Sequence, residues 1–215
     1  MLSIRNNLIL ADPLHAAVFA CLTTTFYAAA RTGEFTTKTL KDFHPSLHVK
    51  PSNIRVELDR NGLSSTIFTL PSTKSEPING EEVSWCKQNG GTDPDSALNH
   101  HLNINTPPPN GPLFAYRSGT SFKPLTKAKF IKTLATAAKA AGLDPLQGHG
   151  IRIGATLEYL LRGTPFDVMK VKGRWASDAF FAYLRKHAQI LAPYMQANPA
   201  QHDEFIRATM PPIRR

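Results

Sequence analysis

The sequence predicts a mainly α-helical domain that carries one small antiparallel β-sheet, an α+β fold. Three observations lead to this prediction. Residues 12–31 form an apolar, alanine-rich run with no proline after Pro13, which is typical of a buried helix. Two segments rich in β-branched residues lie on either side of a turn at residues 59–62, which is the pattern of a β-hairpin. Most of the later chain consists of helix-forming stretches between capping and stop residues.

In the first part of the chain, the expected elements are two helices and three strands. The buried helix over residues 12–31 precedes a second, short helix over residues 36–42. Strands are expected over residues 48–57 and Ser64–Leu70, because both segments are rich in β-branched side chains. The dipeptide Asn61-Gly62 between them is a strong signal for a hairpin turn. A third short strand is expected over residues 82–86.

The rest of the chain is predicted to be helical, with polar residues that begin the helices and glycines that end them. Asp93 and Pro94 are a typical cap and first-turn residue, and they begin a helix over residues 93–103. A proline-rich loop follows over residues 105–112. Thr126 begins a helix that ends at Ala141, where Gly142 stops it. Further helices are expected over Gly148–Leu161 and over residues 166–171, 177–191 and 201–210.

Length and composition indicate one domain of an ordinary globular protein. The chain has 215 residues, of which 41% are hydrophobic and 19% are charged, and this size suits a single core. We expect residues 1–200 to form the domain and residues 201–215 to form a C-terminal tail or helix. No run approaches the ~18 consecutive apolar residues of a membrane span, and the N-terminus lacks the features of a signal peptide. Cys21 and Cys86 lack CxxC spacing, which argues against a zinc site or disulfide framework and for an intracellular location.

The positive charge of the chain favours a polyanionic partner. Lys and Arg number 25 against 16 Asp and Glu, which gives a net charge of +9. A surplus of this size can bind double-stranded DNA by releasing counterions from its phosphates, although solubility alone also explains many basic chains. Lys127, Lys129 and Lys132 make the helix that begins at Thr126 cationic, and such a helix can follow phosphates. The alternative is an ordinary solvated face.

Four motifs with catalytic residue types follow one another along the chain. They are Ala30-Arg31-Thr32-Gly33-Glu34, Thr73-Lys74-Ser75, Gly148-His149-Gly150-Ile151-Arg152, and Gly173-Arg174-Trp175-Ala176-Ser177-Asp178 with Tyr183 beyond it. Taken singly, each has a structural explanation, such as a cation at a helix end or an aromatic residue in the core. Their shared order and spacing indicate a common chemistry instead.

This order resembles the catalytic domain of the tyrosine recombinase (phage-integrase) family over roughly residues 10–191. Members carry Arg with Glu three residues later, Lys in a β-hairpin, His-x-x-Arg at a helix start, and His or Trp after Gly, followed by Tyr. The Gly-Arg-Trp-x-Ser-Asp form is most similar to integrases of eukaryotic mobile elements of the DIRS or Crypton type. That similarity implies a nuclear protein. The resemblance also implies a lone catalytic domain, without the family's helical N-terminal core-binding domain, and a tetramer on DNA for a full-length form.

The resemblance implies a DNA breaking-rejoining enzyme for site-specific recombination or integration, without cofactor or metal. A tyrosine oxygen attacks phosphorus and stores the bond energy in a 3′-phosphotyrosyl link, so no ATP is consumed. Two guanidinium groups would stabilise the charge on the phosphate, and a lysine would protonate the leaving oxygen. The implied catalytic residues are Arg31, Lys74, His149, Arg152, Trp175 and Tyr183. Glu34 and Arg174 would support these residues.

Three questions remain open on the sequence alone. Tyr194 rivals Tyr183 as the nucleophile, although its distance from Gly173 is less suitable. The step from Trp175 to Tyr183 is one residue shorter than is usual in the family, so either Trp175 or Arg174 can fill the His/Trp position. The chain can also be a DNA-binding remnant of a mobile-element integrase that has lost turnover, or a type IB topoisomerase-like enzyme.

Overall fold

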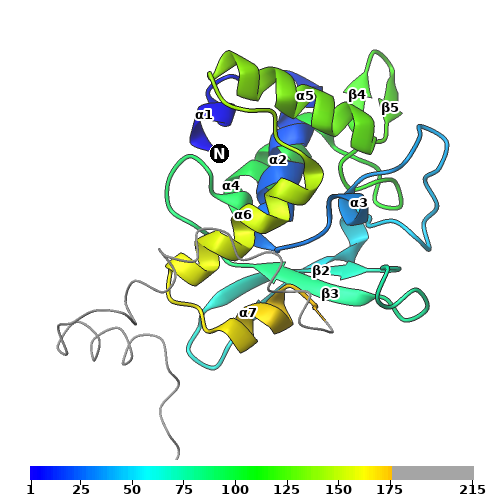
Figure 1. Ribbon diagram of the computed structural model, residues 1–215. Coiled ribbons are helices and arrows are strands. Elements are labelled where there is room, and N and C mark those ends of the chain that lie inside the picture. Colours follow the sequence, from blue (N-terminus) through cyan, green and yellow to red (C-terminus); the bar gives the residue numbers. More distant parts are fainter. Residues whose placement is uncertain (176–215) are drawn as a thin grey trace, which may run out of the picture. The chain divides into compact units, whose positions relative to one another are not determined.

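The computed structural model describes residues 1–175 (Figure 1). The chain divides into two compact units, Met1–Ile151 and Arg152–Arg215. The helices are α1 (Leu2–Arg5), α2 (Pro13–Tyr27), α3 (Thr32–Phe35), α4 (Pro94–Asn105), α5 (Lys127–Ala140), α6 (Gly148–Leu161) and α7 (Phe166–Lys172), with a 3-10 turn η1 (Pro51–Asn53). The strands are β1 (Ile54–Leu58), β2 (Ser64–Leu70), β3 (Glu81–Trp85), β4 (Tyr116–Ser118) and β5 (Ser121–Lys123).

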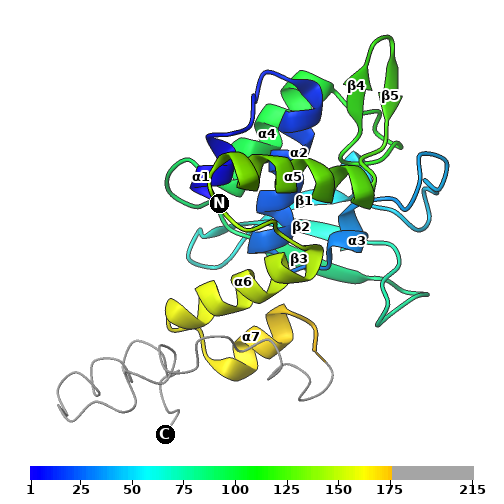
Figure 2. The ribbon, with the colours of Figure 1, turned by 45° about the horizontal axis from the view of Figure 1, so that its top comes forward.

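Helix α2 is the central helix of the first unit. Asp12 caps it by accepting a hydrogen bond from the His15 N–H at 2.9 Å, and Pro13 occupies the first turn. Every residue from 16 to 25 is buried, as expected for a helix that is apolar all round. It packs against α4 and also contacts α5, β3 and β4, while α1 lies next to α5 (Figure 2).

The two cysteines lie in different environments. Cys21 is fully buried in α2, and burial raises the pKa of its thiol to about 12 in spite of a contact with the Thr25 hydroxyl. Cys86 follows β3 and is exposed. Both thiols are free, and the Cys21 thiol is protonated at neutral pH.

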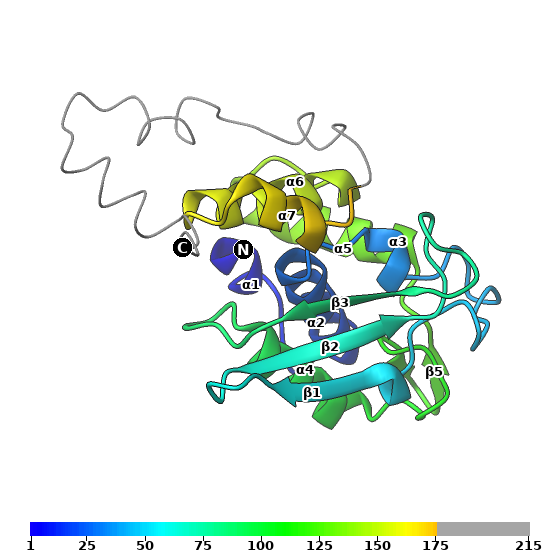
Figure 3. The same cartoon turned by 90° about the horizontal axis from the view of Figure 1, so that it is seen from below.

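The three-stranded sheet of the first unit has β2 in its centre (Figure 3). Both pairings are antiparallel, with Phe68 opposite Ile54 of β1 and Val83 of β3. Phe68 is completely buried, and its ring lies 5.5 Å from the ring of Phe35 in α3. Phe35 also meets Phe114 at 5.8 Å. The contact with Phe68 joins the short helix α3 to the sheet, and the contact with Phe114 joins it to the segment before β4.

Capping signals were reliable predictors of where helices begin and end. Asp93 accepts hydrogen bonds from two backbone N–H groups at the start of α4, and Thr126 accepts one from Lys129 at the start of α5. Gly142 and Gly163 both adopt positive φ angles, of 69° and 83°, just after α5 and α6. The structure therefore confirms the predicted positions of Asp93, Thr126 and Gly142, and Gly163 ends α6 in the same way as Gly142 ends α5.

The predicted end of the apolar helix was wrong. Helix α2 ends at Tyr27 rather than at residue 31. Ala29 adopts a positive φ of 49°, and the Ala30 N–H donates to the Thr25 carbonyl, which closes the helix. Arg31 is therefore the residue that precedes α3, and it does not lie at the carboxyl end of α2.

Two further expectations differ from the structure, and one hairpin of the structure was not expected. Residues 36–42 form no helix, because Thr37 pairs with Thr126 in a parallel β-bridge that uses the backbone groups a helix would need. The first strand begins only at Ile54, since Pro51 starts a 3-10 turn before it. The β4–β5 hairpin, in which Gly119 has a φ of 62° in the connecting turn, was not predicted.

The expected helices over residues 177–191 and 201–210 lie outside the described residues. Within residues 1–175, none of the helices has both the length and the apolar character needed to cross a lipid bilayer.

Candidate active site

Arg31 is held by Glu34 at the point where the chain enters α3. The Arg31 backbone N–H donates to Glu34 Oε2 at 2.8 Å, and Arg31 Nη1 lies 3.1 Å from Glu34 Oε1. The Glu34 side chain is only 6% exposed, whereas that of Arg31 is 34% exposed. The buried Glu34 carboxylate thus holds both the backbone and the side chain of Arg31, while the Arg31 guanidinium group stays accessible to solvent.

The loop between β2 and β3 brings the Lys74 segment to Arg31. Arg31 Nη1 donates to the Ser75 hydroxyl at 3.4 Å. Ser75 donates in turn to Glu81 Oε2 at 2.8 Å, and the Thr73 hydroxyl donates to the same carboxylate oxygen. Lys74 lies between these two anchored residues and is exposed. The loop is therefore shaped by Glu81 and presents Lys74 beside Arg31.

Sequence reasoning missed the two residues that shape this loop. Ser75 belongs to the Thr73-Lys74-Ser75 motif but was assigned no role, and Glu81 was not singled out. Their contribution depends on the register of β2 with β3, which sets Glu81 opposite Leu70 at the base of the loop. A single sequence contains no signal that distinguishes such a glutamate from other strand residues.

The start of α6 is joined to α3 by close packing. The Thr32 hydroxyl donates to the Gly148 carbonyl at 3.0 Å. A Cβ atom at Gly148 would lie only 2.7 Å from Thr32 Oγ1, so this position requires glycine. Arg31 precedes Thr32, and His149 follows Gly148 with an exposed side chain. In the first unit the structure therefore brings together the segments that carry Arg31, Lys74 and His149.

In the second unit, Arg152 and Trp175 form a cluster around Gly173. Arg152 is 2% exposed, and its Nη2 donates to the Gly173 carbonyl. The guanidinium carbon lies 4.3 Å from the centroid of the Trp175 ring, which is a cation–π distance. Arg174, which lies between Gly173 and Trp175 in the sequence, adopts a left-handed φ of 57°. Trp175 is thus the residue of this segment that stacks on Arg152.

We expect Gly173→Ala to disrupt this cluster. The backbone at Gly173 has an ordinary φ of −83°, but an added Cβ atom would overlap the Trp175 ring. Forcing an extra methyl group into a packed site costs about 1–3 kcal/mol. The indole should move off Arg152, and this should be detected as a change in tryptophan fluorescence and a lower melting temperature.

Gly150→Ala is the matched control for this substitution. A Cβ atom at Gly150 would meet nothing within 4 Å, and alanine favours a helix by up to about 1 kcal/mol over glycine. Its melting temperature should stay the same or rise. Equal fluorescence and equal stability in Gly173→Ala and wild type would contradict the packing described here.

The three lysines expected to bind DNA along α5 do not share one face. Lys127 lines a cavity with Lys38. Lys129 and Lys132 line a separate hollow that includes His15. Residue 127 lies about 200° around the helix from residue 129, because each residue of an α-helix turns by about 100°. The cationic helix therefore offers lysines to two different surfaces.

The proposed nucleophile Tyr183 and its rival Tyr194 lie outside the described residues. Among the tyrosines that the structure describes, Tyr27 and Tyr116 are buried, with exposed fractions of 4% and 9%. Tyr159 is half-buried, and the Lys172 ammonium lies 4.8 Å from its ring centroid. Within residues 1–175, no group of three or more His, Cys, Asp or Glu side chains gathers in a way that could hold a metal ion.

Comparison with known proteins gives matches in structure but not in sequence. No family model matches the chain, and no curated protein matches it significantly. A solved structure of FLP recombinase in a Holliday junction complex matches with a TM-score of 0.55 and 14% identity, over 99% of this chain and 51% of that chain. A Flpe–Holliday junction complex matches with a TM-score of 0.54 and 14% identity, over 99% of this chain and 51% of that one.

A third match, to a Flpe mutant in a Holliday junction complex, has a TM-score of 0.54 and 14% identity and covers 96% of this chain and 49% of that chain. The chain thus spans about half the length of the solved chains that it matches. The match to FLP recombinase extends over nearly the whole chain, and the described part of the chain consists of helices and small antiparallel sheets. The chain therefore has the mainly helical fold, with small antiparallel sheets, of FLP recombinase.

Proposed function

We propose that this chain is a DNA breaking-rejoining domain of the tyrosine recombinase type. The observation that carries the proposal is the placement of Arg31, anchored by Glu34, beside the loop that presents Lys74. A guanidinium held by a carboxylate and a nearby lysine, whose ammonium is carried on a flexible stem, suit a reaction at a phosphodiester. The fold shared with FLP recombinase, whose matched structures are Holliday junction complexes, supports the same proposal.

The proposed reaction exchanges one phosphate ester for another. The Tyr183 oxygen attacks phosphorus, a 3′-phosphotyrosyl bond forms, and the bond to the 5′-oxygen breaks. Lys74 gives a proton to that leaving oxygen. A second DNA 5′-hydroxyl then reverses the step and releases the tyrosine, so that no ATP is needed.

The remaining residues stabilise the negative charge on the phosphate and assist the proton transfers of the reaction. Arg31 and Arg152 stabilise the negative charge that builds on the non-bridging oxygens, because guanidinium groups stay charged and donate in a planar fork. His149 assists proton transfer. Trp175 holds Arg152 through its ring, and in the proposed mechanism its indole N–H donates to a phosphate oxygen.

The substrate in this proposal is double-stranded DNA, and a full-length form would act as a tetramer on it. The net charge of +9 supports the choice of DNA. The Gly-Arg-Trp-x-Ser-Asp form of residues 173–178 supports an origin in a eukaryotic mobile element, and hence a nuclear location.

A nicked suicide substrate tests the proposal. The nick lets a short 5′-hydroxyl fragment diffuse away after cleavage, so the protein–DNA link accumulates instead of being resealed. Wild-type protein should form an adduct that resists boiling in detergent and disappears after protease treatment. Specific DNA binding without an adduct would refute the enzyme and favour a DNA-binding remnant. Relaxation of supercoiled plasmid without sequence preference would instead favour a type IB topoisomerase-like activity.

A further inference from the structure

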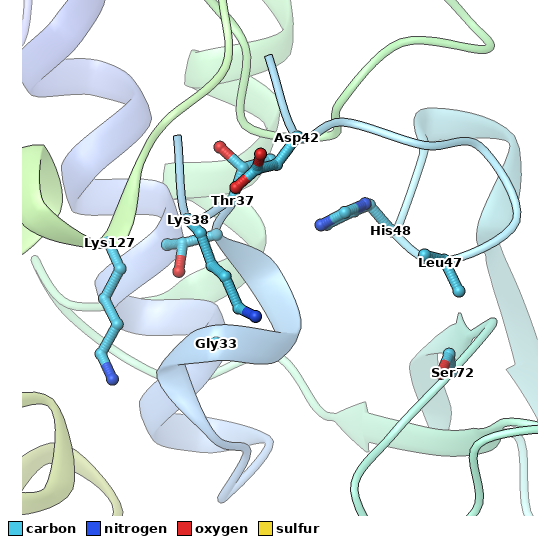
Figure 4. Close-up of a pocket in the computed structure, with 9 residues that line it drawn as sticks. Gly33, Thr37, Lys38, Asp42, Leu47, His48, Ser72 and Lys127 are labelled. Carbon is cyan, nitrogen blue, oxygen red and sulfur yellow. The ribbon is translucent and has the colours of Figure 1, made fainter. Parts of the chain in front are cut away.

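A cavity of about 630 Å³ lies in the first unit, beside the segments that carry Arg31 and Lys74 (Figure 4). We call it the Lys38 cavity. Its wall includes Gly33, Thr37, Lys38, His48, Ser72 and Lys127. Gly33 is two residues beyond Arg31, and Ser72 is two residues before Lys74. The same two segments therefore contribute to both the cavity and the candidate active site of this unit.

Two lysines give the Lys38 cavity a positive charge. The Lys127 N–H donates to the Thr37 carbonyl at 2.9 Å, so the chain pairing that joins residues 37 and 126 also brings Lys38 and Lys127 to the same side of the cavity (Figure 4). Neither lysine forms an ion pair with an acidic group in the part of the chain that the structure describes. Asp42 is the acidic residue of the wall, and its carboxylate already accepts the Thr39 N–H at 2.9 Å.

Neutral hydrogen-bond donors complete the wall. Thr37 is 3% exposed, and its hydroxyl has no hydrogen-bond partner among the described residues. His48 Nδ1 lies 3.1 Å from the His44 nitrogen and 3.2 Å from the His44 carbonyl oxygen, which holds the imidazole ring in place. Figure 4 shows a ring nitrogen of His48 directed into the cavity. Lys127 is also the first residue of the 14-residue helix α5, whose positive end favours an anion.

We propose that the Lys38 cavity binds a backbone phosphate of the DNA duplex, one that neighbours the phosphate held by Arg31. This inference rests on the proposed function. Two ammonium groups, a hydroxyl with no other partner and a helix start form a set of donors that suits a phosphate group. Inorganic phosphate has the same chemistry, but a duplex that lies across Arg31 and Lys74 would come close to the cavity, because the same two segments contribute to its wall. A second phosphate contact would fix the register of the duplex over the candidate active site.

The salt dependence of DNA binding gives the first test. Lys38→Gln and Lys127→Gln should each weaken binding to an intact duplex, and the double variant should lower the slope of log K against log salt concentration by about 1, the value for one lost phosphate contact. Lys139→Gln, which removes the same charge from an exposed position in the last turn of α5, should leave the slope unchanged. Equal slopes for the double variant and Lys139→Gln would overturn the proposal.

Single neutral phosphates in the duplex give the sharper test. A methylphosphonate scan of the binding site should show one position, apart from the cleaved phosphate, at which wild-type binding falls by about tenfold, the loss expected for a charge-assisted contact. The double variant should show no further loss at that position. A scan with the same profile for both proteins would overturn the proposal. Binding of inorganic phosphate alone, without an altered scan, would assign the cavity to a free anion instead.

These measurements separate the cavity from the catalytic proposal. They report binding to uncleaved DNA and do not require turnover. A protein that shows the altered scan but never forms an adduct would keep the phosphate site and refute the enzyme. A protein that forms an adduct with an unaltered scan would refute the cavity alone, and a protein that binds no DNA would refute both.

Discussion

Tyr183→Phe is expected to abolish the covalent adduct with nicked DNA, because phenylalanine lacks the oxygen that attacks phosphorus. No other group in the proposed mechanism can replace that oxygen, so the loss should extend to the detection limit of the gel. DNA binding should remain close to that of wild type, since the proposed phosphate contacts come from Arg31, Arg152 and the Lys38 cavity. Denaturing electrophoresis of labelled DNA measures the adduct, and a band-shift assay measures the binding.

Tyr194→Phe is the matched control. It removes the same hydroxyl group from the rival position, and the adduct should form at the wild-type level. Tyr27 and Tyr116 are poor rivals because both are buried in the first unit. An adduct that survives Tyr183→Phe and is lost in Tyr194→Phe would move the nucleophile to Tyr194.

The second large effect is expected for Arg31→Ala. Removal of one preorganised donor to a developing oxyanion typically slows a reaction by about 10²–10³-fold. Here the substitution also removes the guanidinium that pairs with Glu34, whose side chain is only 6% exposed. Single-turnover cleavage of the nicked substrate at saturating protein should show the loss in the rate of the chemical step.

Two further variants separate charge from geometry at this position. Arg31→Lys keeps the charge but not the planar fork of donors, so it should recover only part of the rate. Arg162→Ala removes an exposed arginine from an i, i+4 ion pair with Glu158, and the cleavage rate should not change. A normal single-turnover rate in Arg31→Ala, with weaker DNA binding only, would make Arg31 a binding residue.

Local rules predicted the parts of the fold that depend on neighbouring residues. Asp93 and Thr126 cap their helices through backbone groups two or three residues away, so the relevant contacts lie within one short sequence window. The end of α2 could not be found in this way. Ala29 adopts a left-handed conformation without being glycine or asparagine, and the alanine run contains no stop residue.

Long-range contacts explain the other differences. Residues 36–42 have no helix because Thr37 pairs with Thr126, which lies far away along the chain. At the candidate active site, the motifs predicted the residue types but not the residues that position them. Glu81 acts through strand register, and the stacking of Trp175 on Arg152 depends on the open space at Gly173. Neither relation is contained in the spacing of a single sequence.

Because the two thiols differ in exposure, a thiol reagent can label one of them selectively. A maleimide reacts with the thiolate, and the Cys21 thiol is both buried and held protonated by a pKa of about 12. Cys86 is exposed, and the sequence has no other cysteine. A fluorophore or a crosslinker will therefore attach at Cys86 alone, just after β3. A fluorophore on Cys86, directly after the strand that begins with Glu81, can therefore report the binding of DNA without any mutation of the protein.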